Sequence, residues 1–155
     1  MAFETERKFL VVADAWDHLT KPVGIRVRQG YIADTDKGNV RVRIMGNEAY
    51  ITVKGKAEGF TRPEFEYPIP LHDAEEILDR LKPNEIIKTR YHVAFKGKTW
   101  DVDVFGGGNT GLVLAEIELA DESEEFEKPL FVGEEVTFDR RYSNTALARV
   151  PYSSW

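Results

Sequence analysis

The sequence contains no cysteine. This absence excludes a disulfide framework, a thiolate metal site and a cysteine nucleophile. The sequence also lacks any apolar run close to the roughly 20 residues that a membrane span requires. A strand pattern that begins at Phe3 leaves no room for a signal peptide. We therefore expect a cytoplasmic protein that has no membrane partner.

The sequence also has no excess of basic residues. The 21 Lys and Arg residues are outnumbered by 27 Asp and Glu residues, which gives a net charge of −6. General nucleic-acid binding requires a basic surface, so we expect no nucleic-acid partner, although a local basic site remains open. A length of 155 residues suits one domain with a proper core, and we expect that domain to span residues 1–155.

Alternation of apolar and polar residues predicts many short strands separated by turns that contain glycine or proline. The predicted strands cover residues 1–12, 25–32, 40–44, 49–54, 62–69, 85–95, 99–105, 112–119 and 136–138, and residues 34–39 and 106–109 are predicted to be loops. Many antiparallel strands with few helices are typical of a sandwich or a barrel.

One helix is clear from the spacing of its apolar residues, over residues 72–81. Asp73 and Glu76 form a capping-box pattern at its start. Shorter helices are predicted at residues 14–20 with Asp14 as N-cap, at 121–127, and at 143–150 with Ser143 as N-cap.

The first strand carries an unusual row of charges. Glu4, Glu6 and Lys8 share one face, where same-face neighbours lie about 6.6 Å apart. Taken alone, this row is simply explained by an edge strand with a surface Glu–Lys pair, because charged residues are mostly exposed.

The same layout recurs along the chain. Carboxylates stand two residues apart at Glu4/Glu6, Glu64/Glu66, Asp101/Asp103 and Glu116/Glu118. Cations do so at Arg26/Arg28, Arg41/Arg43 and Lys88/Arg90, with Lys54 and Arg62 on further strands. A sheet with one solvated face would also show this alternation. Repeated like charges on one face repel each other, however, and paired arginines suit phosphate oxygens.

A closed barrel with its charged face inward would bring both kinds of charge to one cavity. Such a cavity needs water or a ligand to neutralise it. A polyanion that carries Mg²⁺ or Mn²⁺ would satisfy both sets, since these ions prefer carboxylate and phosphate oxygens.

These residues resemble the CYTH superfamily, the triphosphate tunnel metalloenzymes. The run Glu4-Thr-Glu-Arg-Lys8 matches its E-x-E-x-K signature, which alone would be a weak signal. The resemblance continues in order along nearly the whole chain, at residues 28–32, 41–43, 52–54, 62–66, 88–90, 101–103, 116–118 and 139–147. In size the chain is most similar to the short bacterial members, many of which hydrolyse inorganic triphosphate.

The resemblance implies a mainly β (α+β) fold, a closed eight-stranded antiparallel β-barrel tunnel with a few outer helices. It implies that Glu4, Glu6, Glu116 and Glu118 hold divalent cations, with Asp103, Glu64 and Glu66 as helpers. It implies that Lys8, Arg41, Arg43, Lys54, Lys88 and Arg90 bind phosphates. Arg62, Arg140 and Arg141 are weaker candidates, of which Arg62 is kept in the predicted set. Glu4, Glu6, Lys8 and Lys88 are predicted to be catalytic. Arg26 is left out of the predicted set, because family sequences need not carry a cation at its position.

The implied activity is Mg²⁺- or Mn²⁺-dependent hydrolysis of a small-molecule triphosphate, first of all inorganic tripolyphosphate to diphosphate and phosphate. Alternatives are a class IV-type adenylate cyclase, a thiamine or nucleoside triphosphatase, and a non-catalytic polyphosphate- or nucleotide-binding module. A homodimer is a further expectation. The three histidines, His18, His72 and His92, are interpreted as surface or structural residues.

Overall fold

The computed structural model describes residues 3–155, so Met1 and Ala2 of the predicted first strand lie outside the described residues. The strands are β1 (Phe3–Val11), β2 (Ile25–Thr35), β3 (Gly38–Met45), β4 (Glu48–Gly55), β5 (Thr61–Pro68), β6 (Asn84–Phe95), β7 (Lys98–Phe105), β8 (Val113–Glu118) and β9 (Val132–Glu135). The helices are α1 (Ala13–His18), α2 (Leu71–Leu81) and α3 (Asn144–Arg149), with 3₁₀ turns η1 (Gly107–Asn109), η2 (Arg140–Tyr142) and η3 (Tyr152–Ser154).

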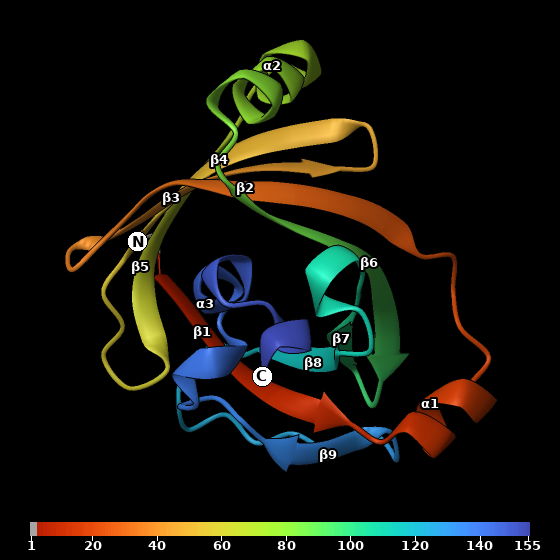
Figure 1. The fold of residues 1–155 in the computed structure, drawn as a ribbon. Coiled ribbons are helices and arrows are strands. Elements are labelled where there is room, and N and C mark those ends of the chain that lie inside the picture. Colours follow the sequence, from red (N-terminus) through yellow and green to blue (C-terminus); the bar gives the residue numbers. More distant parts are fainter. Residues whose placement is uncertain (1–2) are drawn as a thin grey trace.

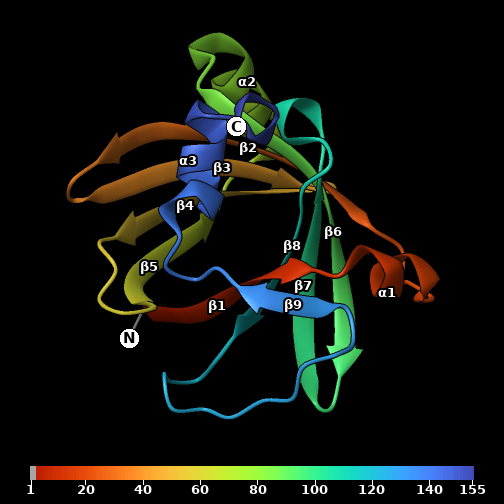
Figure 2. The same cartoon turned by 60° about the horizontal axis from the view of Figure 1, so that its bottom comes forward.

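Eight strands close into an antiparallel ring in the order β5-β4-β3-β2-β6-β7-β8-β1 (Figure 1). Pairing of Glu4 with Arg62 joins β1 to β5 and completes the ring. The first residues of β1 pair with β5, and its last residues pair on the same edge with β9, a ninth strand outside the ring (Figure 2). The predicted closed eight-stranded barrel is therefore confirmed.

Two apolar layers cover the outside of the barrel. One centres on Phe9, Trp100 and Ile117, and it is covered by Trp16 of α1 and Phe131 of the chain between β8 and β9. The other lies between α2 and the strands β3 and β4. The outward side chains beneath these two layers are thus buried, and the charged side chains that alternate with them along the strands point inward.

Part of the barrel interior is apolar. Ile86, Phe105 and Leu114 face inward and pack with Leu147 of α3. In Figure 1 α3 lies within the outline of the strand ring. The interior is therefore filled at the α3 end, and the charged residues occupy the remaining length.

Several predicted elements differ from the structure. Residues 121–127 form no helix, because the Asp121 carboxylate accepts from the Ser123 backbone N–H and Phe126 is drawn into the outer core. The last strand is β9 rather than residues 136–138, since a turn from Val136 to Asp139 ends its pairing with β1. Of residues 34–39, predicted to be a loop, 34 and 35 belong to β2 and 38 and 39 belong to β3. Within the predicted loop 106–109, residues 107–109 form η1.

Of the three predicted helix caps, one is found in the structure and two are not. The N-cap of α2 is Pro70 and that of α1 is Val12, and neither has a side-chain capping bond, so the capping roles of Asp73 and Asp14 are wrong. Ser143 does cap α3, accepting the Ala146 N–H at 3.2 Å. None of the helices within residues 3–155 combines the length and apolar character needed to cross a membrane.

Candidate active site

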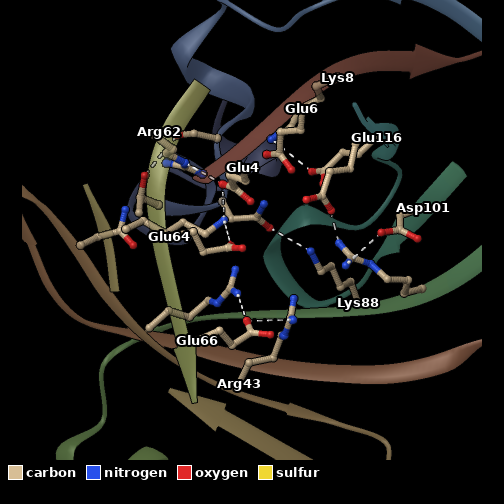
Figure 3. Close-up of a pocket in the computed structure, with 18 of the residues that line it drawn as sticks. Glu4, Glu6, Lys8, Arg43, Arg62, Glu64, Glu66, Lys88, Asp101 and Glu116 are labelled. Carbon is tan, nitrogen blue, oxygen red and sulfur yellow. Dashed lines mark hydrogen bonds and ion pairs between the residues drawn. The ribbon is translucent and has the colours of Figure 1, made fainter. Parts of the chain in front are cut away.

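Charged side chains from seven strands surround one cavity of about 290 Å³ inside the barrel, which we call the tunnel cavity (Figure 3). Its volume is at the lower end of small-molecule sites. Its ionisable lining residues are Glu4, Glu6, Lys8, Arg41, Arg43, Lys54, Arg62, Glu64, Glu66, Lys88, Arg90, His92, Asp101, Glu116 and Glu118.

Glu4 is held by two cations from neighbouring strands. Its Oε1 accepts from Lys54 Nζ and from Arg62 Nε, both at 2.8 Å. Burial would raise the pKa of Glu4, but Lys54 and Arg62 outweigh burial and lower that pKa to about 2. Glu4 is therefore ionised at neutral pH, and its charge is already compensated.

Asp103 holds the two cations of β6. It is 1 % exposed, and it accepts from Lys88 Nζ at 2.7 Å and from two Arg90 nitrogens at 2.7 and 2.9 Å. Burial lowers the pKa of Lys88 to about 8 in spite of Asp103. Both Asp103 oxygens are occupied, so in this structure the residue fixes the positions of Lys88 and Arg90 from behind the cavity. Its predicted part in metal binding stays a prediction.

Arg41 and Arg43 share a single carboxylate. Glu66 Oε2 lies 3.4 Å from Arg41 and 3.5 Å from Arg43. The Nε atoms of both arginines are buried and have no hydrogen-bond partner among the described residues. Burial, with Arg41 and Arg90 nearby, lowers the pKa of Arg43 to about 10. Two guanidinium groups that share one carboxylate leave positive charge uncompensated in the cavity lining, so this wall is suited to an anion.

The opposite imbalance exists between β1 and β8. Glu6 faces Glu118 in the strand register, and Lys8 faces Glu116. Within residues 3–155 neither Glu6 nor Glu118 forms an ion pair, whereas Glu116 lies 3.5 Å from Lys8. Burial, then the charges of Glu116 and Glu4, raises the pKa of Glu6 to about 7. Burial also raises the pKa of Glu118.

Unpaired carboxylate oxygens fit a hard divalent cation. No three Asp, Glu or His side chains of residues 3–155 form a preformed metal cage. Mg²⁺ commonly binds through one or two carboxylates together with substrate phosphates, so a full cage is not required. The donor set at Glu6, Glu116 and Glu118 therefore fits Mg²⁺ or Mn²⁺ that arrives with a phosphate ligand.

Comparison with known proteins gives the family. Residues 2–148 match the CYTH domain. The chain belongs to the CYTH family. It is 49% identical over 157 residues to an inorganic triphosphatase of Acetivibrio thermocellus, covering 100% of this chain and 99% of the relative. It is 37% identical over 153 residues to an inorganic triphosphatase of Nitrosomonas europaea, covering 94% and 96%.

A solved structure is also similar over nearly the full length of this CYTH chain. The crystal structure of an inorganic triphosphatase is 34% identical, with a TM-score of 0.66 and coverage of 96% of this chain and 95% of that chain. The barrel topology described above is thus shared with an experimentally determined CYTH structure.

The CYTH barrel brings almost all of the sequence-predicted residues to the tunnel cavity. Asp103 lies behind the cavity wall, and the cations described next do not line it. Arg28 lies outside, paired with Glu85 at 2.8 Å and with Asp79 of α2 at 2.9 Å. The inward positions of β2 include Gln29 and Tyr31, so the Arg26/Arg28 pair belongs to the outer face. Exposed Arg140 and Arg141 lie in the chain after β9 and do not line the tunnel cavity.

Sequence reasoning missed several residues of the CYTH cavity. His92 lines the cavity, and its Nδ1 lies 2.6 Å from Asp101 Oδ1. The position of Asp101 could have been predicted from its spacing, because it stands two residues from Asp103 and therefore shares a strand face with it. Tyr31 and residues 143–145 also line the cavity. Residues 143–145 had no local signal, because they reach the cavity only through the path of the folded chain.

Proposed function

We propose that this chain hydrolyses inorganic triphosphate to diphosphate and orthophosphate with the help of Mg²⁺ or Mn²⁺. The observation that carries the proposal is the double imbalance of the tunnel cavity. Two guanidinium groups at Arg41 and Arg43 that share one carboxylate call for an anion, and unpaired carboxylates at Glu6 and Glu118 call for a cation. A triphosphate carrying a divalent metal supplies both, and the two relatives named inorganic triphosphatase support this substrate.

In this proposal the predicted residues divide by charge. Lys8, Arg41, Arg43, Lys54, Arg62, Lys88 and Arg90 bind phosphate oxygens. Glu6, Glu116 and Glu118 hold metal directly, and Glu4, Glu64 and Asp103 assist or orient the cations beside them. A bound divalent ion would neutralise phosphate charge and acidify a water molecule.

Hydrolysis then needs positioning and charge stabilisation more than covalent chemistry. A water oxygen adds to a terminal phosphorus as the bridging P–O bond breaks. Arg41 and Arg43 hold the phosphate chain, because both line the cavity and share a single carboxylate. Lys88, fixed by Asp103, stabilises the negative charge that develops on the leaving oxygen. No side-chain nucleophile is required.

A substrate panel tests the proposal. Purified protein is incubated with tripolyphosphate, ATP or thiamine triphosphate, with Mg²⁺ or Mn²⁺ and with a chelator control. We expect metal-dependent orthophosphate release that is fastest from tripolyphosphate. Cyclic AMP from ATP without tripolyphosphate hydrolysis would favour a cyclase, and faster release from thiamine triphosphate would favour that substrate. Tight tripolyphosphate binding without hydrolysis would favour the alternative of a non-catalytic polyphosphate-binding module.

Three further expectations remain predictions: a single tunnel domain over residues 1–155, a homodimer and a cytoplasmic location. The proposed partner is a small triphosphate, and no nucleic acid or membrane is included.

A further inference from the structure

The C-terminal segment, which we define as residues 139–155, touches two lysines of the tunnel cavity. The Tyr142 carbonyl accepts from Lys8 Nζ at 3.0 Å, and Asn144 Oδ1 accepts from Lys88 Nζ at 3.2 Å. Leu147 of the same segment packs into the apolar end of the barrel. The segment therefore contributes directly to the surroundings of both ammonium groups.

One buried amide ties this segment to the barrel. Asn109, in η1 after β7, is only 4 % exposed. Its Nδ2 donates to the Leu147 carbonyl at 3.3 Å, and its Oδ1 accepts the Tyr152 N–H at 2.7 Å. A single side chain thus binds the C-terminal segment at two points, one within α3 and one in the chain that follows α3.

The glycines around Asn109 provide a close-fitting seat. A Cβ added to Gly108 would lie 3.0 Å from Pro151 Cβ, and one added to Gly111 would lie 3.8 Å from the Tyr152 ring. Beyond this seat, Trp155 packs against Tyr142 and Tyr152 with ring centroids 5.1 Å apart in each case. The glycine-rich loop is therefore a docking site for the segment.

The Lys88 ammonium has three N–H donors. Asp103 takes one at 2.7 Å and Asn144 takes another at 3.2 Å. Because these two hydrogen bonds fix the orientation of the ammonium group, they also fix the direction of its third N–H. Without Asn144, the ammonium would be free to rotate about its contact with Asp103, and under the proposed function it would lose its alignment with a substrate phosphate oxygen.

We propose that Asn109 is a positioning residue, which acts through the C-terminal segment to keep the Asn144 amide on Lys88. The proposal rests on the proposed triphosphatase function, because Lys88 is assigned a role in that reaction. Asn109 does not line the tunnel cavity, so any effect on catalysis must pass through the segment.

A double-mutant cycle tests the connection. Asn109→Ala, Asn144→Ala and the double variant are assayed with tripolyphosphate at a temperature where all are folded, with exposed Asn47→Ala as the matched control. We expect each single variant to lower kcat about tenfold, as for loss of one aligned contact, with KM within about twofold. If Asn109 acts through Asn144, the double variant falls no further than Asn144→Ala alone. Asn47→Ala keeps the wild-type kcat.

Tryptophan fluorescence supplies a readout independent of activity. Trp16 and Trp100 are 6 % and 0 % exposed, whereas Trp155 is 44 % exposed and belongs to the segment. Asn109→Ala is expected to shift emission to longer wavelength and to increase acrylamide quenching, and Asn144→Ala leaves both unchanged.

Each contrary result has its own meaning. An unchanged kcat in Asn109→Ala, or losses that multiply in the double variant, overturns the positioning role. Absence of tripolyphosphate hydrolysis by the wild type overturns the proposed function and this role with it. In that case the emission shift still shows whether Asn109 holds the segment.

Discussion

Glu6 differs from the other carboxylates of the tunnel. It is half-buried among acidic neighbours and forms no ion pair in the described part of the chain, so loss of solvation and the charges of Glu116 and Glu4 raise its pKa to about 7. Glu4, two residues away, is neutralised by Lys54 and Arg62. One strand thus carries a satisfied and an unsatisfied carboxylate on the same face.

Glu6→Gln tests this difference through pH. The folded-state pKa lies above the ordinary 4.5, so the stability contributed by protonated Glu6 is complete below pH 4.5 and is lost as pH rises through about 7. Without metal at pH 8, Glu6→Gln should therefore unfold at a higher temperature than the wild type, by roughly 2–4 °C for a gain of about 1 kcal/mol. At pH 4 the two melting temperatures should coincide in calorimetry. An equal difference at both pH values would contradict the raised pKa.

Arg41→Ala tests the anion-binding wall. Removing a buried guanidinium to which the proposal assigns phosphate binding should raise KM for tripolyphosphate roughly tenfold or more, with a smaller change in kcat. Arg28→Ala is the matched control, because Arg28 pairs with Glu85 and Asp79 outside the barrel and should leave KM unchanged. Equal KM changes in both variants would show that the effect is not specific to the cavity.

At the scale of elements, α2 packs on the barrel without entering it. Leu78 is 1 % exposed and packs with Val42 and Ala49 of the strands beneath. Gly30 of β2 leaves room for this contact, since a Cβ there would lie 2.8 Å from Leu78 Cδ2. The helix therefore stabilises the fold from outside the site.

Leu78→Ala should lower the free energy of unfolding by about 2–5 kcal/mol, because it leaves a cavity between α2 and the sheet. Leu81→Ala, at a position 62 % exposed, should change it by less than about 0.5 kcal/mol. Urea unfolding measures both. A small loss for Leu78→Ala would show that α2 is loosely packed.

The strands were predictable from sequence because a half-buried strand repeats every two residues. The ends of the elements were less predictable. Asp73 offers a capping pattern, yet the backbone of α2 begins at Leu71 after Pro70. The stretch 121–127 contains helix-favouring residues, but burial of Phe126 against the outer core determines its path. Tertiary contacts overrode local preference in both cases.

At the scale of the whole molecule, the net charge of −6 does not describe the tunnel cavity, whose lining includes seven Lys or Arg and seven Asp or Glu side chains. Alternation predicted which residues share a face, but it could not show that β1 and β5 pair to close the ring, because those residues are far apart in sequence. The resemblance supplied that closure. The contribution of residues 143–145 to the cavity depended on the folded path of the C-terminal segment and was found only in the structure.

Tripolyphosphate should raise the melting temperature of the whole protein. In the proposed function it binds only the folded cavity, where its negative charge compensates the two guanidinium groups of Arg41 and Arg43 that share Glu66. At 100 times its Kd the gain is about 2.7 kcal/mol, which is several degrees for a chain of this size. The Arg41→Ala/Arg43→Ala double variant should show a smaller shift at the same concentration. A wild-type melting temperature unmoved by saturating tripolyphosphate would count against the tunnel cavity as its site.

The central claim is tested most directly by a phosphorus NMR time course of tripolyphosphate with Mg²⁺, comparing wild type with Glu116→Gln. Glu116 is 9 % exposed and lies 3.5 Å from Lys8 between the two sets of charges. The wild type should convert tripolyphosphate into diphosphate and orthophosphate in equal amounts, and Glu116→Gln should fold normally but react at least about tenfold more slowly. Unchanged tripolyphosphate with the wild type, or equal rates for the two proteins, would contradict the account.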